Sequence, residues 1–381
     1  MITGDRVRHA RELRGWTQTY LAECVHVTQG AIARVENNEL PLSQVLLEAI
    51  AFQTGFPLTF FRKPPAVDFS EGSLLFRVKA NLTLQEKNRA RRYAMTLFEA
   101  TMQLGEKLNE IPLRLPRLKE EPVQAARMAR ASLGLTPDRP IGNLIRTIER
   151  SGVLVFPLPI SLERGDAFSA WVEKKHKPAG EGGIHHPVIV MDVKSPSDRL
   201  RYTIAHELGH LIMHQAAEGE RKQLEKQANV FAAEFLMPEV AMREELITPV
   251  TLSRLAPLKL KWGVSLQALV QRSQSLEIIT QRQCTYLFTQ ISSQKWKINE
   301  PNSDNIISEK PRALRKMMEL IYGEPLDFGR IANELATSRE VLREVMVLYA
   351  SRTPQNKEEA SSTVVLPFQG HRNGCDRIQS N

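Results

Sequence analysis

Two histidines and a glutamate lie together in an otherwise apolar stretch, "IAHELGHLIMH", residues 204–214. Residues four apart in a helix share one face, so His206 and His210 would present two imidazoles to one point. A tetrahedral zinc ion takes such nitrogen ligands. Glu207 would lie beside them, within reach of a metal-bound water whose pKa zinc lowers toward neutrality. The stretch therefore predicts a hydrolytic metal site, with Glu207 as its general base.

An ordinary histidine pair on an amphipathic helix would show the same spacing, and the neighbouring residues decide between the two interpretations. They are Ile204, Ala205, Leu208, Leu211 and Ile212. This apolar surround predicts a buried helix, where polar groups without partners are costly and a metal would compensate them. Gly209 costs about 1 kcal/mol relative to alanine inside a helix. Its presence predicts that another group packs very closely there.

A catalytic zinc also needs a third protein ligand, and "LEKQANVFAAEFLMP" offers Glu225 and Glu234. Asn229 lies one turn after Glu225, so Glu225 is predicted to bind the metal while Asn229 orients a ligand histidine. Glu234 is about half a turn out of phase and is expected to face away. His214 lies a full turn beyond His210, and we expect a helix-end or hydrogen-bonded histidine. His185 and His186 are expected to form a loop pair.

The stretches "RYTIAHELGHLIMH" and "EKQANVFAAEFLMP" resemble the ImmA/IrrE family of bacterial metallopeptidases. "DAFSAW" and "HPVIVMDVKSPSDRLR" are similar to the strands that precede the family's motif. The resemblance covers residues 141–240 closely, and continues more loosely through "KWGVSLQALVQRSQSLEIIT". It implies a zincin-like domain in which His206, His210 and Glu225 bind zinc, or manganese, and Glu207 is catalytic.

The same resemblance implies a substrate and a biological role. Family members are implied to cleave a helix-turn-helix repressor and so to switch on the repressed genes. We expect the substrate segment to add as an extra strand beside the sheet, because proteases bind extended peptides through main-chain hydrogen bonds. Activity is expected to be gated.

A second motif lies near the N-terminus, in "RELRGWTQTYLAECVHVTQGAIARVENNE". Its spacing is that of a helix-turn-helix, with Thr28 as N-cap of a recognition helix over residues 29–36. "WTQTYLA" and "TQGAIARVENNE" resemble the Cro/CI (XRE) class from residue 6 to about residue 60. The resemblance implies a DNA-binding set of five residues, which are Gln18, Thr28, Gln29, Arg34 and Asn37. Gln18 and Asn37 would contact phosphates, Gln29 a base edge such as adenine, and Arg34 guanine or phosphate.

The readout of bases by this head is expected to be thin. Gly30 replaces the usual polar side chain and Ala31 adds only a methyl group. The alternative is a docking head that binds a protein and no longer binds DNA. Because such modules bind paired half-sites as dimers, a homodimer on double-stranded DNA is also expected.

The pattern of elements predicts a mostly α fold with a small β-sheet (α+β). Long helices are expected over residues 83–110 and 223–236, and strands at "GVLVFPL", "AFSAWV" and "PVIVMDV". The expected parts are a five-helix XRE-type head (1–66), a helical linker or dimerisation region (67–135), a zincin-like peptidase domain (136–245), a helical C-terminal region (246–352) and a disordered tail (353–381). Residues 62–73, "RKPPAVDFSEGS", read as a linker. Residues 311–350 read as a small helical unit, in which 326–347 has a helix-turn-helix look but a structural role.

The charge is unevenly distributed. The chain of 381 residues has a formal net charge of +8, which permits a polyanionic partner. Residues 1–66 carry seven Lys and Arg against six Asp and Glu, whereas residues 77–130 carry twelve against six. The basic excess therefore lies outside the head, where it predicts either a solvated helix face or phosphate contacts.

Targeting and cysteine content narrow the class further. The N-terminus lacks the apolar core of a signal peptide, and no stretch of eighteen apolar residues predicts a membrane span. Cys24, Cys284 and Cys375 are far apart, which excludes a disulfide framework and suits a reducing cytoplasm. A digestive protease is thus disfavoured.

Two functions remain. In the first, a DNA-binding regulator carries a zinc endopeptidase that cuts a regulatory protein, in trans or in itself. In the second, the peptidase-like domain is a sensor or dimerisation module with little proteolysis. The presence of His206, Glu207, His210 and Glu225 together favours the first.

Overall fold

The structure is a computed structural model, and it describes residues 4–65, 67, 83–108, 113–161, 167–173, 185–214 and 220–351. The predicted tail and most of the predicted linker lie outside these residues, as does Cys375. Cys24 and Cys284 are both buried.

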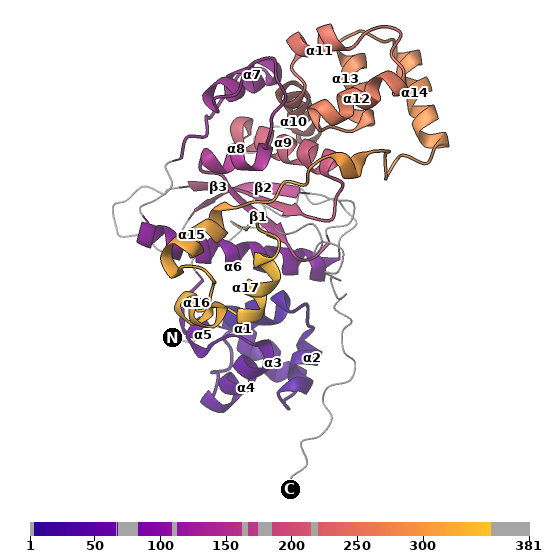
Figure 1. Ribbon diagram of the computed structural model, residues 1–381. Helices are drawn as coiled ribbons and strands as arrows, with labels where there is room; N and C mark the ends of the chain where they lie inside the picture. The colour runs from indigo at the N-terminus through magenta and orange to yellow at the C-terminus, as the bar shows by residue number, and fades with distance from the viewer. Residues whose placement is uncertain are drawn as a thin grey trace.

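The fold is mostly α-helical with one small sheet, as the sequence predicts (Figure 1). Each of the expected helices and strands is present. The helices of the head are α1 (Gly4–Leu13), α2 (Gln18–Cys24), α3 (Gln29–Glu36), α4 (Gln44–Thr54) and α5 (Leu58–Arg62). Those of the middle are α6 (Leu84–Leu108), α7 (Pro122–Ser132), α8 (Leu144–Arg150), α9 (Ser197–Met213), α10 (Arg221–Leu236) and α11 (Glu239–Glu245). Those of the last part are α12 (Leu252–Trp262), α13 (Leu266–Ser275), α14 (Gln281–Ser293), the short 3-10 helix η1 (Ser303–Asn305), α15 (Ala313–Tyr322), α16 (Phe328–Leu335) and α17 (Arg339–Met346).

Three strands form the sheet, in the order β1-β3-β2: β1 (Leu154–Leu158), β2 (Ala167–Glu173) and β3 (His185–Asp192). β1 runs parallel to β3, and β2 runs antiparallel to it. Successive side chains of a strand face opposite sides of the sheet. Val188 and Val190 of β3 therefore join one hydrophobic core, while Ile189 and Met191 join another.

These two cores divide the molecule differently from the predicted domains. The first core contains the head, α6, one face of the sheet and the last three helices, α15–α17. The second contains the other face of the sheet and the helices from α7 to α14. In Figure 1, α6 lies beneath the sheet and α8 and α9 lie above it. Helices α6 and α7, the two described helices of the predicted region 67–135, thus belong to different cores.

Helix α6 lies in the region that the sequence analysis gave as a linker or a dimerisation element. In the structure it packs against other helices of the same chain. Its residues from Tyr93 to Thr101 are all buried. On one side the guanidinium of Arg6 in α1 donates to both carboxylate oxygens of Glu99, at 2.9 and 3.0 Å. On another, the Tyr93 hydroxyl donates to Glu344 of α17 at 2.8 Å. The head is therefore fixed to the rest of the chain through α6.

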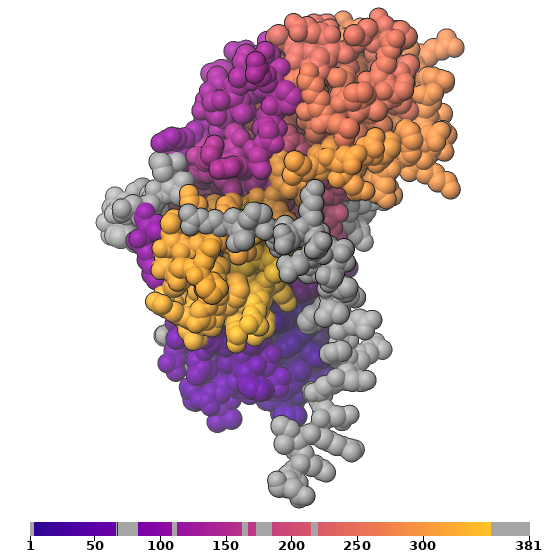
Figure 2. All heavy atoms as spheres, viewed as in Figure 1, coloured from indigo at the N-terminus to yellow at the C-terminus, as the bar shows by residue number. Residues whose placement is uncertain are grey.

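The last three helices sit against the head, as the adjoining yellow and indigo surfaces in Figure 2 show. Arg14 of the head donates to Ser338 Oγ at 3.0 Å and lies 3.5 Å from a carboxylate oxygen of Glu340. The helix pair α16 and α17 thus has a structural contact with the head, which agrees with the expected structural role.

The basic excess in residues 77–130 predicted either a solvated helix face or phosphate contacts. Neither interpretation holds for the two buried arginines Arg92 and Arg130. Arg92 is only 5% exposed, and its guanidinium donates to Glu12 at 2.7 Å. Arg130 is 3% exposed and donates to the Phe235 carbonyl at 2.6 Å. A buried charge is tolerated only with close partners. Here the partners lie on other helices, so Arg92 links α6 to α1 and Arg130 links α7 to α10.

Within the described ranges, no helix is long and apolar enough to cross a membrane.

Candidate metal centre

Helix α9 lies against β2 and β3, and α10 packs along α9. Gly209 of α9 permits their close approach, since a Cβ placed there would lie 2.9 Å from Phe231 Cδ1 on α10. The expectation of close packing at this glycine is confirmed. The short separation brings a carboxylate from α10 over the histidines of α9.

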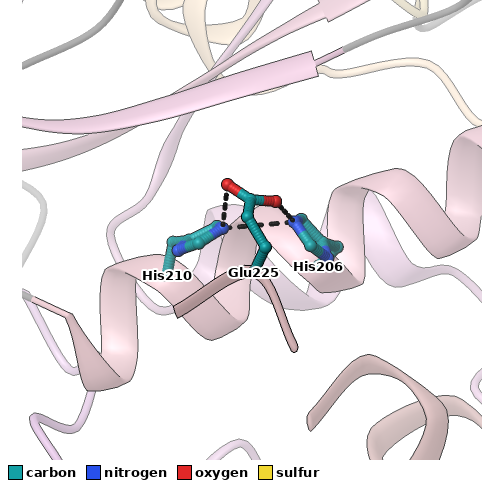
Figure 3. Close-up of side chains that lie close together, drawn as sticks. All are labelled: His206, His210 and Glu225. Atoms are coloured by element: carbon teal, nitrogen blue, oxygen red, sulfur yellow. Dashed lines mark hydrogen bonds and ion pairs between the residues drawn. The ribbon is translucent and has the colours of Figure 1, made fainter. Parts of the chain in front are cut away.

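Three side chains meet where the two helices face each other (Figure 3). His206 Nε2 lies 3.2 Å from Glu225 Oε2, and His210 Nε2 lies 3.7 Å from Glu225 Oε1. The two Nε2 atoms are 3.1 Å apart. Hydrogen bonds from the two imidazoles lower the pKa of Glu225.

The donor set of this cluster fits a divalent ion. The candidate ligand atoms of His206, His210 and Glu225 all lie within 4.8 Å of one another. It is the one such group of three among the residues that the structure describes. Two imidazole nitrogens and one carboxylate oxygen are the ligands of a catalytic zinc with one open position. The structure thus brings together the three residues that the sequence singled out as ligands.

Asn229 lies where an orienting residue is needed. Its Oδ1 is 3.1 Å from His206 Nδ1, and its Nδ2 donates to the Glu225 carbonyl at 2.9 Å. The second bond fixes which amide atom faces the histidine, so Oδ1 accepts from Nδ1–H. If a neutral His206 binds an ion, its Nε2 is then the unprotonated nitrogen that faces the cluster.

Glu207 is buried beside the cluster, and the structure adds a partner for it that the sequence analysis missed. The Ser169 hydroxyl, on β2, donates to Glu207 Oε2 at 2.5 Å. Both side chains are nearly inaccessible, at 3% exposed for Ser169 and 5% for Glu207. The one signal in the sequence is a lone hydroxyl among the apolar residues of "AFSAWV".

The other candidate metal ligands near the motif do not face the cluster of His206, His210 and Glu225. Glu234 faces away from the cluster. Its carboxylate accepts a hydrogen bond from Arg127 at 2.9 Å and forms an ion pair with buried Arg272. His214 ends α9 and is hydrogen-bonded, as expected. The expected loop pair is wrong, because His185 and His186 are the first residues of β3.

The reason for that error lies in the register of the sheet. His186 pairs with Val172 on β2 and packs edge-on against Phe98 of α6, with ring centroids 5.8 Å apart. It therefore belongs to the face of the sheet opposite α9. Two polar residues at the start of "HHPVIVMD" concealed a strand that begins earlier than its apolar run.

A cavity of about 1010 Å³ extends from the cluster along α10 to α13. Its lining includes Tyr202, Glu225, Asn229 and Gln271. Lys222 and Lys226 stand one turn apart on the same wall. The candidate ligand Glu225 therefore lies at the edge of a space large enough for several residues of a peptide.

Comparison with known proteins matches two segments of the chain. Residues 148–274 match the family described as the IrrE N-terminal-like domain. This segment is similar to the IrrE N-terminal-like domain, and we refer to it as the IrrE-like domain. Residues 7–61 match the helix-turn-helix family, so a helix-turn-helix head precedes the IrrE-like segment. The IrrE-like match extends past residue 245 into α12 and α13.

The radiation response metalloprotease IrrE of Deinococcus radiodurans is a similar curated protein. It is 29% identical over 155 residues, which cover 36% of this chain and 42% of that protein. The chain thus matches less than half of the length of that relative.

The predicted DNA contacts form a connected surface around buried Glu36 of the head. Gln29 Nε2 donates to Gln18 Oε1 at 2.7 Å, and Gln18 Nε2 donates to Glu36 at 2.9 Å. Arg8 donates to Asn37 Oδ1 at 2.7 Å and also to Glu36. The network pre-positions three of the five predicted contact residues.

The other two lie outside this network. Thr28 caps α3, its hydroxyl accepting from Ala31 N at 3.2 Å, as predicted. Arg34 is exposed in the last turn of α3. The structure therefore places a single exposed cation on the recognition helix.

Proposed function

We propose that this protein is a DNA-binding regulator whose IrrE-like domain is a metal-dependent endopeptidase. Its substrate is a regulatory protein, a helix-turn-helix repressor, whose cleavage relieves repression. One observation carries the proposal: His206, His210 and Glu225 converge on one point beside buried Glu207. Zinc is the ion that this donor set favours, with manganese as the alternative.

Each residue of the cluster has a role in the proposed hydrolysis. His206, His210 and Glu225 would hold the ion. When bound, the ion polarises the scissile carbonyl and makes water more acidic. Glu207 accepts a proton from the attacking water and returns it to the leaving amine. Ser169 holds the carboxylate of Glu207 in place, since its hydroxyl donates to Oε2 at 2.5 Å.

The substrate backbone is proposed to pair with β2. Among the described strands, β2 pairs with β3 alone, so its other side is an edge. Ser169 and Trp171 of β2 both contact α9, the indole donating to the Leu211 carbonyl at 2.9 Å. An extended segment added to this edge would run alongside the motif helix. The cavity along α10 would take residues on one side of the cut.

For the head, we propose binding to double-stranded DNA through α3, with the predicted contacts Gln18, Gln29, Arg34 and Asn37. Support comes from their connected arrangement at the surface of the helix-turn-helix domain. The capped start of α3 at Thr28 fixes where that helix begins.

The decisive experiment compares the wild type with Glu207→Gln. Both are loaded with zinc and incubated with the repressor encoded nearest to the gene. The wild type is expected to make a single cut, and Glu207→Gln to keep its zinc and to cut at least 100-fold more slowly, because a general base contributes roughly that much. Exposed Glu244 on α11 provides the control Glu244→Gln, which should cut like the wild type.

Two results would contradict the proposal. Equal cleavage by Glu207→Gln would remove the assigned role of that residue. A zinc-loaded wild type that cuts no such repressor, yet binds DNA, would favour the sensor or dimerisation module instead.

A further inference from the structure

A chain of hydrogen bonds extends behind the second candidate ligand. His210 Nδ1 lies 2.9 Å from His214 Nδ1, and His214 Nε2 lies 3.0 Å from Gln227 Oε1. We infer that His214 and Gln227 are positioning residues that fix the tautomer and orientation of His210 for metal binding. The inference rests on the proposed metal site and assigns it two further residues.

Only one distribution of protons satisfies this chain when His210 binds an ion. Its Nε2 faces the cluster, 3.1 Å from His206 Nε2, and must carry no proton to be a ligand. Nδ1 of a neutral His210 then carries the proton and donates to His214 Nδ1. His214 must accept at Nδ1, so its own proton lies on Nε2. That nitrogen donates to Gln227 Oε1, which as a carbonyl oxygen only accepts.

The chain ends at the side-chain amide of Gln227, whose oxygen lies 3.0 Å from His214 Nε2. Without an acceptor at Gln227, the form of His214 with its proton on Nε2 would lose a hydrogen bond, and the form with the proton on Nδ1 would become relatively more favourable. That proton would point at His210 Nδ1 and would favour the tautomer with Nε2 protonated, which does not bind metal. The side-chain oxygen of Gln227 thus favours, two hydrogen bonds away, the tautomer of His210 whose Nε2 is available to bind an ion.

The arrangement parallels the one at the first ligand. Asn229 accepts from His206 Nδ1 directly, at 3.1 Å. Glu225, Gln227 and Asn229 all lie on α10, so one helix supplies the third ligand and holds both histidines of α9. His210 is 2% exposed, which leaves little water to replace a lost partner. Removing such partners of metal ligands typically costs 10- to 100-fold in affinity.

The test measures zinc affinity by competition with a chromophoric chelator, without reference to cleavage. Gln227→Met keeps the length of the side chain but removes the acceptor, and His214→Phe removes the middle of the chain. Each is expected to bind zinc about 10- to 100-fold more weakly. Gln227→Glu, which restores an acceptor, is expected to bind at least as tightly as the wild type. Gln223→Met, at an exposed position of α10, is the matched control and should leave the affinity unchanged.

A second readout separates this role from a merely structural one. Nitrogen-15 NMR of the zinc-loaded wild type should show His214 protonated at Nε2 and His210 at Nδ1. Finding His214 protonated at Nδ1, or wild-type zinc affinity in Gln227→Met, would overturn the inference. Because neither readout involves a substrate, a protein that binds zinc but fails to cut the repressor would contradict the proposed function alone.

Discussion

At the scale of single residues, the least expected feature is the hydroxyl that holds Glu207. Ser169 comes from the sheet, whereas the motif lies on a helix, and the two are 38 residues apart in the chain. Sequence spacing predicts neighbours within one helix but not a partner on another element. The three candidate ligands could be predicted from helix geometry alone. His206 and His210 are one turn apart, and Glu225, unlike Glu234, lies on the same face of its helix as Asn229. Ser169, Gln227 and the role of His214 required the packing of β2, α9 and α10.

Ser169→Ala tests this contact. Loss of the hydrogen bond should leave zinc binding intact and lower kcat about 10-fold, because a loosely held base is less often in the productive orientation. Steady-state cleavage and metal content of the same preparation would be measured. Ser169→Thr keeps the hydroxyl and suits a strand, so it should recover most of the activity. Wild-type kcat in the alanine variant would show that the contact does not position Glu207.

At the scale of elements, the approach of α9 and α10 depends on Gly209. In an open helical position, alanine would stabilise the protein by up to about 1 kcal/mol over glycine. At Gly209 the added Cβ would meet Phe231 at 2.9 Å, so Gly209→Ala should instead destabilise by about 1–3 kcal/mol. Urea unfolding gives the free energy of unfolding.

A matched control exists in α3. A Cβ at Gly30 would meet nothing within 4 Å, so Gly30→Ala should have the opposite sign. Phe231→Leu should relieve part of the cost of Gly209→Ala. Stabilisation by both alanine variants would mean that the helices are not in tight contact.

The elements themselves follow well from local patterns, but their assembly does not. Helical and alternating repeats predicted the motif helix and the three strands, because each pattern is set by burial of one face. The same repeats gave α6 an apolar stripe without saying what covers it. Along the chain, Arg6 of the head lies 93 residues from its partner Glu99, and Glu344 of α17 lies 251 residues from its partner Tyr93. Local patterns in the sequence cannot predict such long-range contacts.

At the scale of the whole molecule, a buried carboxylate is one of the links between the IrrE-like domain and the last three helices. Glu149 of α8 accepts from the backbone N–H groups of Arg312 and Ala313, at the start of α15. Burial raises the pKa of Glu149 to about 7, although those hydrogen bonds and the charge of Arg312 lower it. Burial, together with the nearby charge of Glu149, raises the pKa of Tyr349.

This shift predicts a pH dependence of stability. The folded state holds the proton of Glu149 more tightly than the unfolded state, whose pKa is near 4.5. The contribution of this group to stability is therefore greatest at pH 4.5 and below, and falls as the pH rises to about 7, by about 2–3 kcal/mol. In Glu149→Gln, the free energy of unfolding should therefore fall less between pH 5 and 7 than it does in the wild type. An unchanged slope would contradict the raised pKa.

The charge distribution of the whole chain also bears on DNA binding. With a head close to neutral and one exposed cation on α3, few phosphates are neutralised, so affinity should fall only shallowly with salt. Arg34→Ala should weaken binding about 10-fold or more, as expected for one strong contact. Fluorescence anisotropy with a labelled operator at several salt concentrations measures both. A steep salt slope retained in Arg34→Ala would place the phosphate contacts elsewhere on the chain.

Helix α10 carries Glu225, Gln227 and Asn229 within five residues, on one rigid rod that advances 1.5 Å per residue. A shift of that rod by a single residue along its axis would withdraw the carboxylate and both histidine supports in one movement. Loss of the ion would then be abrupt and complete, with no half-assembled centre along the way.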